Sequence, residues 1–206
     1  MLTTTIKTTF LFALIAIVIT SCTKESDVEY PIAKKTLLAQ DFNNFLTTTP
    51  TNTYALNEPG WTSYAQIGTK KWLEKSYKSN GYASFASFNS GEPNNVTWLI
   101  SPAINMDTQE GEKLSFLTAQ DGYVKNSSNS LELYVSTDYD EVNFNNASWQ
   151  KVTFNVANQN TTRFVYVPSG IIDLSSYTGT IHFAFKYFGT TSLSGGYQID
   201  NIRIFY

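Results

Sequence analysis

The sequence predicts an all-β protein, an antiparallel two-sheet jelly-roll sandwich, and two observations lead to this fold class. Aromatic residues make up 15% of the 206 residues, charged residues also make up only 15%, and Ser, Thr and Asn are abundant. This composition favours short strands joined by polar turns. Apolar and polar residues also alternate in many short segments, and no long helical periodicity follows Leu37. We therefore expect one sandwich domain of ordinary size at residues 37–206.

The first 21 residues predict a signal peptide that is removed from the mature protein. Lys7 precedes an apolar run over residues 10–19, which is too short to span a bilayer but suits the core of a signal peptide. The run ends in "ITSC", which resembles the lipobox of bacterial lipoproteins. That resemblance implies that Cys22 is acylated and becomes the first residue of the mature chain. The alternative is an ordinary secretory leader with a chance cysteine near its end.

Residues 22–36 are predicted to form the lipidated cysteine and a short disordered tether, because they are mostly polar and charged. Cys22 is the only cysteine, so the chain cannot form an internal disulfide. Thr23 follows it in place of the aspartate that is linked with inner-membrane retention. We therefore expect a lipid anchor in the outer membrane. The acidic residues of "KESD" resemble the surface-export signals of some lipoproteins, which implies display at the cell surface.

Alternating apolar residues justify the strands one by one. Leu131, Leu133 and Val135 share one face of an expected strand, whereas the segment 163–167 is apolar on both faces. The segment 42–82 has mixed patterning. Loops rich in Gly, Asn, Ser and Pro separate the strands. The expected strands are 36–42, 81–88, 96–101, 113–119, 131–136, 149–156, 163–167, 180–188 and 195–206.

The last expected strand contains a break in its alternation. Tyr197 and Ile199 lie in one phase and Ile202 and Ile204 in the other, so the pattern slips by one residue at Asp200–Asn201. A β-bulge leaves one residue unpaired and explains such a slip. A bulge also exposes carbonyl oxygens, which Ca²⁺ accepts as ligands together with carboxylates and amides. The slip therefore predicts either a calcium site or a polar site that only stabilises the bulge.

Six motifs in order resemble the choice-of-anchor J and cleaved-adhesin domains, which are sandwiches similar to MAM domains. The strand "WLISP" lies in "NNVTWLISPAINMD", and "LLAQDFNN" resembles the opening strand of that family. The others are "PGW", "LELYVSTDYD", "IIDLSSYTGTIHFAFKYFG" and the closing "YQIDNIRI". Together they cover about residues 37–206. The resemblance implies a jelly-roll sandwich that acts in binding or adhesion.

The resemblance also implies a structural calcium ion held by the first and last strands. In this chain the implied ligands are Asp41, Asn43 and Asp200. The family usually has a glutamate after the phenylalanine of the opening strand, and Asn43 stands at that position here. Asp41 shares its side of an extended strand with Asn43 and is able to supply the missing charge.

Trp72 and Tyr123 are the candidate ligand-binding residues, because aromatic side chains beside polar loops suit the apolar face of a sugar ring. Packing in the core is the alternative for Trp72. His182 is expected to be structural, since no catalytic motif accompanies it. Loop carboxylates at 121, 138, 140 and 141 could form the acid pair of a glycoside hydrolase.

The sequence therefore predicts a non-enzymatic lipoprotein of the cell envelope with a binding or adhesion domain, and a polysaccharide as the favoured partner. A structural or accessory lipoprotein that contacts another envelope protein is the alternative, and a glycoside hydrolase is a third. The net charge of −3 without a basic cluster argues against nucleic acid as a partner.

Overall fold

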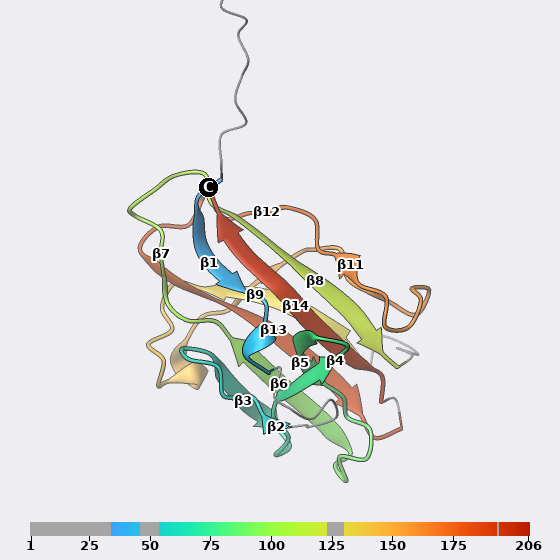
Figure 1. The fold of residues 1–206 in the computed structure, drawn as a ribbon. Coiled ribbons are helices and arrows are strands. Elements are labelled where there is room, and N and C mark those ends of the chain that lie inside the picture. Colours follow the sequence, from blue (N-terminus) through green and yellow to red (C-terminus); the bar gives the residue numbers. More distant parts are fainter. Residues whose placement is uncertain (1–33, 46–53, 123–129, 193) are drawn as a thin grey trace, which may run out of the picture. The chain divides into compact units, whose positions relative to one another are not determined.

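The computed structural model describes residues 34–45, 54–122, 130–192 and 194–206, and within them two antiparallel sheets form a β-sandwich (Figure 1). The fold class predicted from the sequence is therefore confirmed. Two short 3-10 helices, Asn43–Phe45 and Phe144–Asn146, are the helical elements of this part of the chain. None of its helices is both long and apolar enough to span a membrane.

The first sheet has the strand order β11-β8-β14-β5-β4-β2, while β1 pairs with β14 and β12 pairs with β8. The long strands β8 and β14 lie at its centre (Figure 1). Its strands are β1 (Thr36–Gln40), β2 (Tyr54–Ala55), β4 (Leu73–Tyr77), β5 (Asn80–Phe85), β8 (Lys113–Asp121), β11 (Val167–Pro168), β12 (Ile172–Asp173) and β14 (Gly196–Phe205).

The second sheet has the order β10-β9-β13-β6-β3, and β7 pairs with the start of β13. The segment 42–82, whose pattern was mixed, contributes β3 to this sheet and β2 and β4 to the other. The strands of the second sheet are β3 (Thr62–Ile67), β6 (Asn94–Ile100), β7 (Ile104–Asn105), β9 (Ser130–Ser136), β10 (Gln150–Val152) and β13 (Thr180–Thr190).

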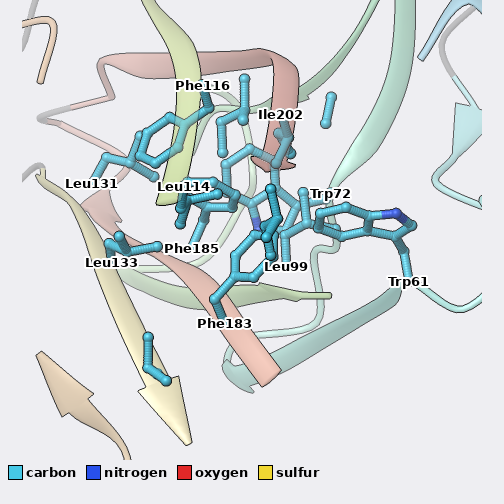
Figure 2. Packing of buried hydrophobic residues seen from close by; sticks show 14 of the residues in the cluster. Trp61, Trp72, Leu99, Leu114, Phe116, Leu131, Leu133, Phe183, Phe185 and Ile202 are labelled. Atoms are coloured by element: carbon cyan, nitrogen blue, oxygen red, sulfur yellow. The ribbon is translucent and has the colours of Figure 1, made fainter. Parts of the chain in front are cut away.

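The core between the sheets is filled by the residues whose alternation predicted the strands. Phe116 of β8 meets Phe185 of β13 edge to face, with ring centroids 4.7 Å apart, so the contact joins the two layers. This is a favourable geometry for aromatic pairs. Figure 2 shows Leu114, Leu133 and other side chains of both sheets packed around these rings.

Trp72 lies in this core, and its side chain is 0% exposed (Figure 2). Its ring packs against Phe85 of β5 at a centroid distance of 5.9 Å. The backbone N–H of Trp72 donates to the Ser63 hydroxyl at 2.8 Å, which fixes the residue immediately before β4. The prediction that Trp72 forms an exposed sugar platform is therefore wrong, and core packing is its role.

Two expected strands are shorter in the structure. The segment 163–167 pairs only at β11, because Phe164 has φ 62, a left-handed conformation that interrupts a strand. Its N–H donates to the Gln120 carbonyl at 3.0 Å. The segment 149–156 pairs only over β10, although Phe154 beyond it still packs against Phe116.

The outer face of the second sheet carries a smaller aromatic cluster. Phe144 and Trp149, from the segment after β9, pack on Trp98 of β6 with centroids 5.0 and 5.3 Å away. His182 is buried in the same layer, with Nδ1 2.9 Å from the Ser101 carbonyl oxygen and its ring against Tyr139. These contacts agree with the structural role predicted for His182.

Candidate functional site

Strand β14 changes partners at the point where its alternation slips. β5 pairs with the residues 197–199, whereas β1 pairs with the residues 202–205, so β1 and β5 lie end to end along one edge of β14 (Figure 1). The register with β8 shifts between Asp200 and Arg203, and Asn201 has φ 49. The predicted β-bulge is therefore confirmed. We call this junction of Asp41–Asn43, Asn80–Gly81 and Asp200–Asn201 the seam.

The Asp200 carboxylate is buried at the seam, with only 1% of the residue exposed. Its Oδ2 accepts a hydrogen bond from Asn80 Nδ2 at 2.9 Å, and its Oδ1 accepts one from the Asn201 N–H at 2.6 Å. Burial raises the pKa of Asp200, and the charge of Asp41 raises it further, while the two hydrogen bonds act in the opposite direction. The seam thus holds an acid in a poorly solvated position.

The chain after β1 packs closely on β5. Phe42 has φ 52, which ends β1, and its carbonyl oxygen would lie 1.9 Å from a Cβ at Gly81. The Asn43 N–H donates to Asp41 Oδ1 at 3.1 Å, while Asn43 Oδ1 accepts from the Gly81 N–H at 3.3 Å. The structure therefore brings Asp41, Asn43 and Asp200, the three residues predicted to bind a metal, to one seam.

The side-chain atoms of the seam that are able to bind a metal are hard oxygen atoms, which suit Ca²⁺ rather than a metal that prefers thiolate or imidazole ligands. Two of them are the carboxylates of Asp41 and Asp200, and the third is the amide of Asn43. In the described part of the chain, no group of three or more His, Cys, Asp or Glu residues is arranged to hold a metal ion. A calcium ion here would need amide and backbone oxygens besides the two carboxylates.

A groove lies beside the seam, on the face of the first sheet that points away from the core. Its cavity is about 800 Å³ in volume, within the range of sites that bind small molecules. Alternation places Tyr82 of β5 and Gln198 of β14 on its floor, since Ala83 and Ile199 point into the core. The groove is lined by Lys75, Tyr77, Lys78, Asn80, Tyr82, Leu117, Asp121, Phe164, Tyr166, Gln198, Asp200 and Asn201.

Two rims border this groove, and each carries an exposed aromatic ring. Tyr77 stands at the β4–β5 turn and is 62% exposed, while Phe164 precedes β11 and is 51% exposed. Lys78 and Ser79 between the two strands both have positive φ, as expected in a tight hairpin turn. The Tyr166 hydroxyl is near Asp200, and burial, followed by the charge of Asp200, raises the pKa of Tyr166.

A second cavity of about 440 Å³ continues the groove toward the start of β14. Lys75 and Asp121 line both cavities, and Lys75 Nζ lies 3.5 Å from Asp121 Oδ2. Arg163 approaches the same carboxylate at 4.0 Å. We call the two cavities together the binding groove. The remaining residues of the second cavity are Leu73, Ala86, Phe88, Gly122, Ser192, Ser194 and Gly195.

Sequence reasoning missed the aromatic residues of the binding groove. The signal was present in "SYKSNGYAS", where a turn separates Tyr77 from Tyr82 and both side chains face outward. Phe164 was assigned to a strand, which hid its exposed position. Tyr123 and Cys22, predicted as a ligand-binding residue and the lipidation site, lie outside the described residues.

The candidate acids of a glycoside hydrolase have different surroundings. Asp138 Oδ1 accepts from the Ser148 N–H at 2.8 Å, and Asp140 Oδ1 accepts from the Asn143 N–H at 2.6 Å. The hydrogen bond from the Ser136 hydroxyl, at 2.7 Å, lowers the pKa of Asp138 most, and that from Ser148 adds to it. The hydrogen bonds from Asn143 lower the pKa of Asp140 to about 2. Both side chains organise the segment over the second sheet, whereas Asp121 lies in the binding groove beside Lys75.

Solved structures resemble this fold. The K3 cleaved adhesin domain of Lys-gingipain from Porphyromonas gingivalis matches with a TM-score of 0.56 and 21% identity, covering 84% of this chain and 99% of that domain. The K1 cleaved adhesin domain of the same protein matches with a TM-score of 0.53 and 24% identity, covering 81% and 96%. The fold implied by the sequence resemblance is thus found in cleaved adhesin domains.

A search of curated proteins finds no match. The model of one family, described as a domain of unknown function (DUF5017), matches residues 68–205. The match includes β4 through β14, and therefore both rims of the binding groove and the bulge of the seam. The chain belongs to the DUF5017 family.

Proposed function

We propose that the protein is a non-catalytic binding domain that holds a polysaccharide in the binding groove of the first sheet. The observation that carries this proposal is the pairing of exposed aromatic residues on the two rims with amide side chains between them. Tyr77 and Phe164 offer apolar ring faces at the rims, while Asn80 and Gln198 offer amides between them.

This arrangement suits a sugar chain for two physical reasons. A pyranose ring has an apolar face that packs on an aromatic ring, and its hydroxyl groups both donate and accept hydrogen bonds. Amide side chains meet the hydroxyl groups in both roles. One rim is the turn between β4 and β5, and the other is the segment that leads into β11. Strands of the first sheet therefore hold both rims in place.

The proposal is tested by retention of the purified protein in gels that contain soluble polysaccharides. We expect a polysaccharide that retards the native protein to bind about tenfold more weakly to Tyr77→Ala and to Phe164→Ala, since removing an aromatic residue that anchors a ligand costs about 1.4 kcal/mol or more. Tyr54→Ala is the matched control, because Tyr54 is 54% exposed and lies outside the binding groove. Equal loss in all three variants, or none in any, would contradict the proposal.

We further propose that Cys22 anchors the protein by lipid to the outer membrane, with the binding groove available at the cell envelope. Support comes from the "ITSC" motif and from the position of the single cysteine. Several acyl chains hold a protein stably at a membrane, whereas one chain is marginal. We expect Cys22→Ser to move the protein from the membrane fraction to the soluble fraction. An unchanged membrane fraction for this variant would rule out the lipid anchor.

We also propose a structural calcium ion at the seam, with Asp41, Asn43 and Asp200 among its ligands. The closeness of two carboxylates, of which Asp200 is buried, supports the proposal. Bound Ca²⁺ would relieve the repulsion between the two charges and stabilise the junction of β1 and β5.

Removal of calcium is the test of this site. For free Ca²⁺ at 100 times its Kd, binding stabilises the fold by about 2.7 kcal/mol, or roughly 5–10 °C in Tm for a domain of this size. We expect EDTA to lower Tm by that amount and added Ca²⁺ to restore it. Asp200→Asn should lose the response to Ca²⁺. An unchanged Tm with EDTA, together with no calcium by elemental analysis, would exclude a tightly bound ion.

A further inference from the structure

The two rims of the binding groove each carry a cation held over the exposed aromatic ring. Lys78 Nζ lies 5.3 Å from the centroid of the Tyr77 ring, and Arg163 Cζ lies 4.6 Å from that of Phe164. Cation–π attraction favours both contacts. Lys78 lines the first cavity and Arg163 lines the second, so positive charge is present along the whole groove.

The acidic groups of the binding groove are already engaged. Asp121 lies between Lys75 at 3.5 Å and Arg163 at 4.0 Å, and Asp200 is 1% exposed with amide donors on both oxygens. Among the residues that the structure describes, the lining includes three cations, at 75, 78 and 163, against these two carboxylates. The groove therefore has a positive excess on a chain whose formal net charge is −3.

The groove also continues past the ion pair of Lys75 and Asp121. Asn201 lines the first cavity and Gly195 the second. Gly195 and Asn201 are six residues apart, and at the rise per residue of a β-strand this separation corresponds to about 20 Å. This length accommodates several consecutive sugar rings, so a chain would meet cations at more than one of its rings.

We propose that the binding groove selects a linear polysaccharide that carries carboxylates, such as a polymer of uronic acids; this inference rests on the proposed function. A uronate ring has an apolar face for Tyr77 or Phe164 and a carboxylate for the cation beside it. Arg163 suits this task, because a guanidinium donates two parallel hydrogen bonds to one carboxylate. A neutral sugar chain would use the aromatic rings but would form no ion pair with the rim cations.

The test uses the purified full chain and two probes of equal length, the hexamer of galacturonic acid and the neutral hexamer of xylose. We expect the acidic hexamer to bind at least tenfold more tightly than the neutral one. The affinity for the acidic hexamer should also fall when NaCl rises from about 50 to 300 mM, because salt screens exposed charges. The affinity for the neutral hexamer should change little.

Single substitutions distinguish an effect of the rim charges on binding from an effect on folding. Arg163→Gln is expected to weaken binding of the acidic hexamer about tenfold, as the loss of one charged hydrogen-bonding pair does. The matched control is Arg203→Gln, since Arg203 is the other arginine of the chain and is exposed on β14 outside the groove. This variant should bind as the native protein does. Lys78→Gln repeats the test on the other rim if Arg163→Gln does not fold.

The outcomes distinguish this inference from the proposed function. If the xylose hexamer binds as tightly as the galacturonic acid hexamer, or if the rim cations have no effect, selection of acidic chains is wrong while polysaccharide binding stands. If no polysaccharide retards the protein and neither hexamer binds, both proposals fail. Tighter binding of the acidic hexamer that depends on Arg163 and not on Arg203 supports both.

Discussion

Gly81→Ala is expected to lower the free energy of unfolding by about 3 kcal/mol or more. The effect is large although the substitution removes no contact, because the added methyl group overlaps the backbone. A Cβ at Gly81 would lie 1.9 Å from the carbonyl oxygen of Phe42 and 2.7 Å from its carbonyl carbon. Both atoms are backbone, so a side-chain rotation cannot relieve the overlap. Either β1 or β5 has to move along β14, and the seam opens.

Urea unfolding followed by tryptophan fluorescence measures this effect. Gly91→Ala is the control, because Gly91 has φ 77 with no atom within 4 Å of an added Cβ. It bears only the conformational penalty of an L-residue at positive φ, about 1–2 kcal/mol. If Gly81→Ala is no less stable than Gly91→Ala, the close approach of Phe42 to β5 is not part of the fold in solution.

Trp72→Ala is expected to cost about 3–5 kcal/mol of stability, the range for deletion of a buried large aromatic side chain. The ring is 0% exposed and packs on Phe85, so its removal leaves a cavity between the sheets. Trp72→Phe should lose less, because a second ring fills part of the same space. Urea unfolding at neutral pH measures the stability of both variants.

The same pair of variants decides between the core and a sugar platform as the role of Trp72. Trp72→Phe should remain folded and should bind polysaccharide as the native protein does, because the side chain does not reach the surface. Loss of polysaccharide binding by a Trp72 variant of native stability would mean that this ring contacts the ligand and that its buried position is wrong.

Regular alternation explains why much of the fold is predictable from the sequence. In β13, Ile181, Phe183, Phe185 and Tyr187 all point into the core, as their spacing indicates. The slip at Asp200 was equally informative, because a change of phase within one strand has few causes other than a bulge. The alternation of apolar and polar residues is therefore enough to predict the core-facing side of a strand whose two neighbouring strands pair with it regularly.

The binding groove was not predictable in the same way. Whether Trp72 or Tyr77 points outward depends on the register of β4 against β5, which the chain between residues 68 and 81 does not encode as a clear alternation. The exposed position of Phe164 depends on its own left-handed backbone conformation, which interrupts an apolar run. Both are tertiary effects, set by the neighbouring strands rather than by local preference.

Hydrogen exchange with and without a bound polysaccharide is the most direct test that the binding groove is the ligand site. With a polysaccharide that retards the native protein, we expect slower exchange in the β4–β5 hairpin around Lys78 and in the segment around Phe164. The outer face of the second sheet, at Trp98, should exchange unchanged. Protection confined to that second face, with none at the hairpin, would contradict the account.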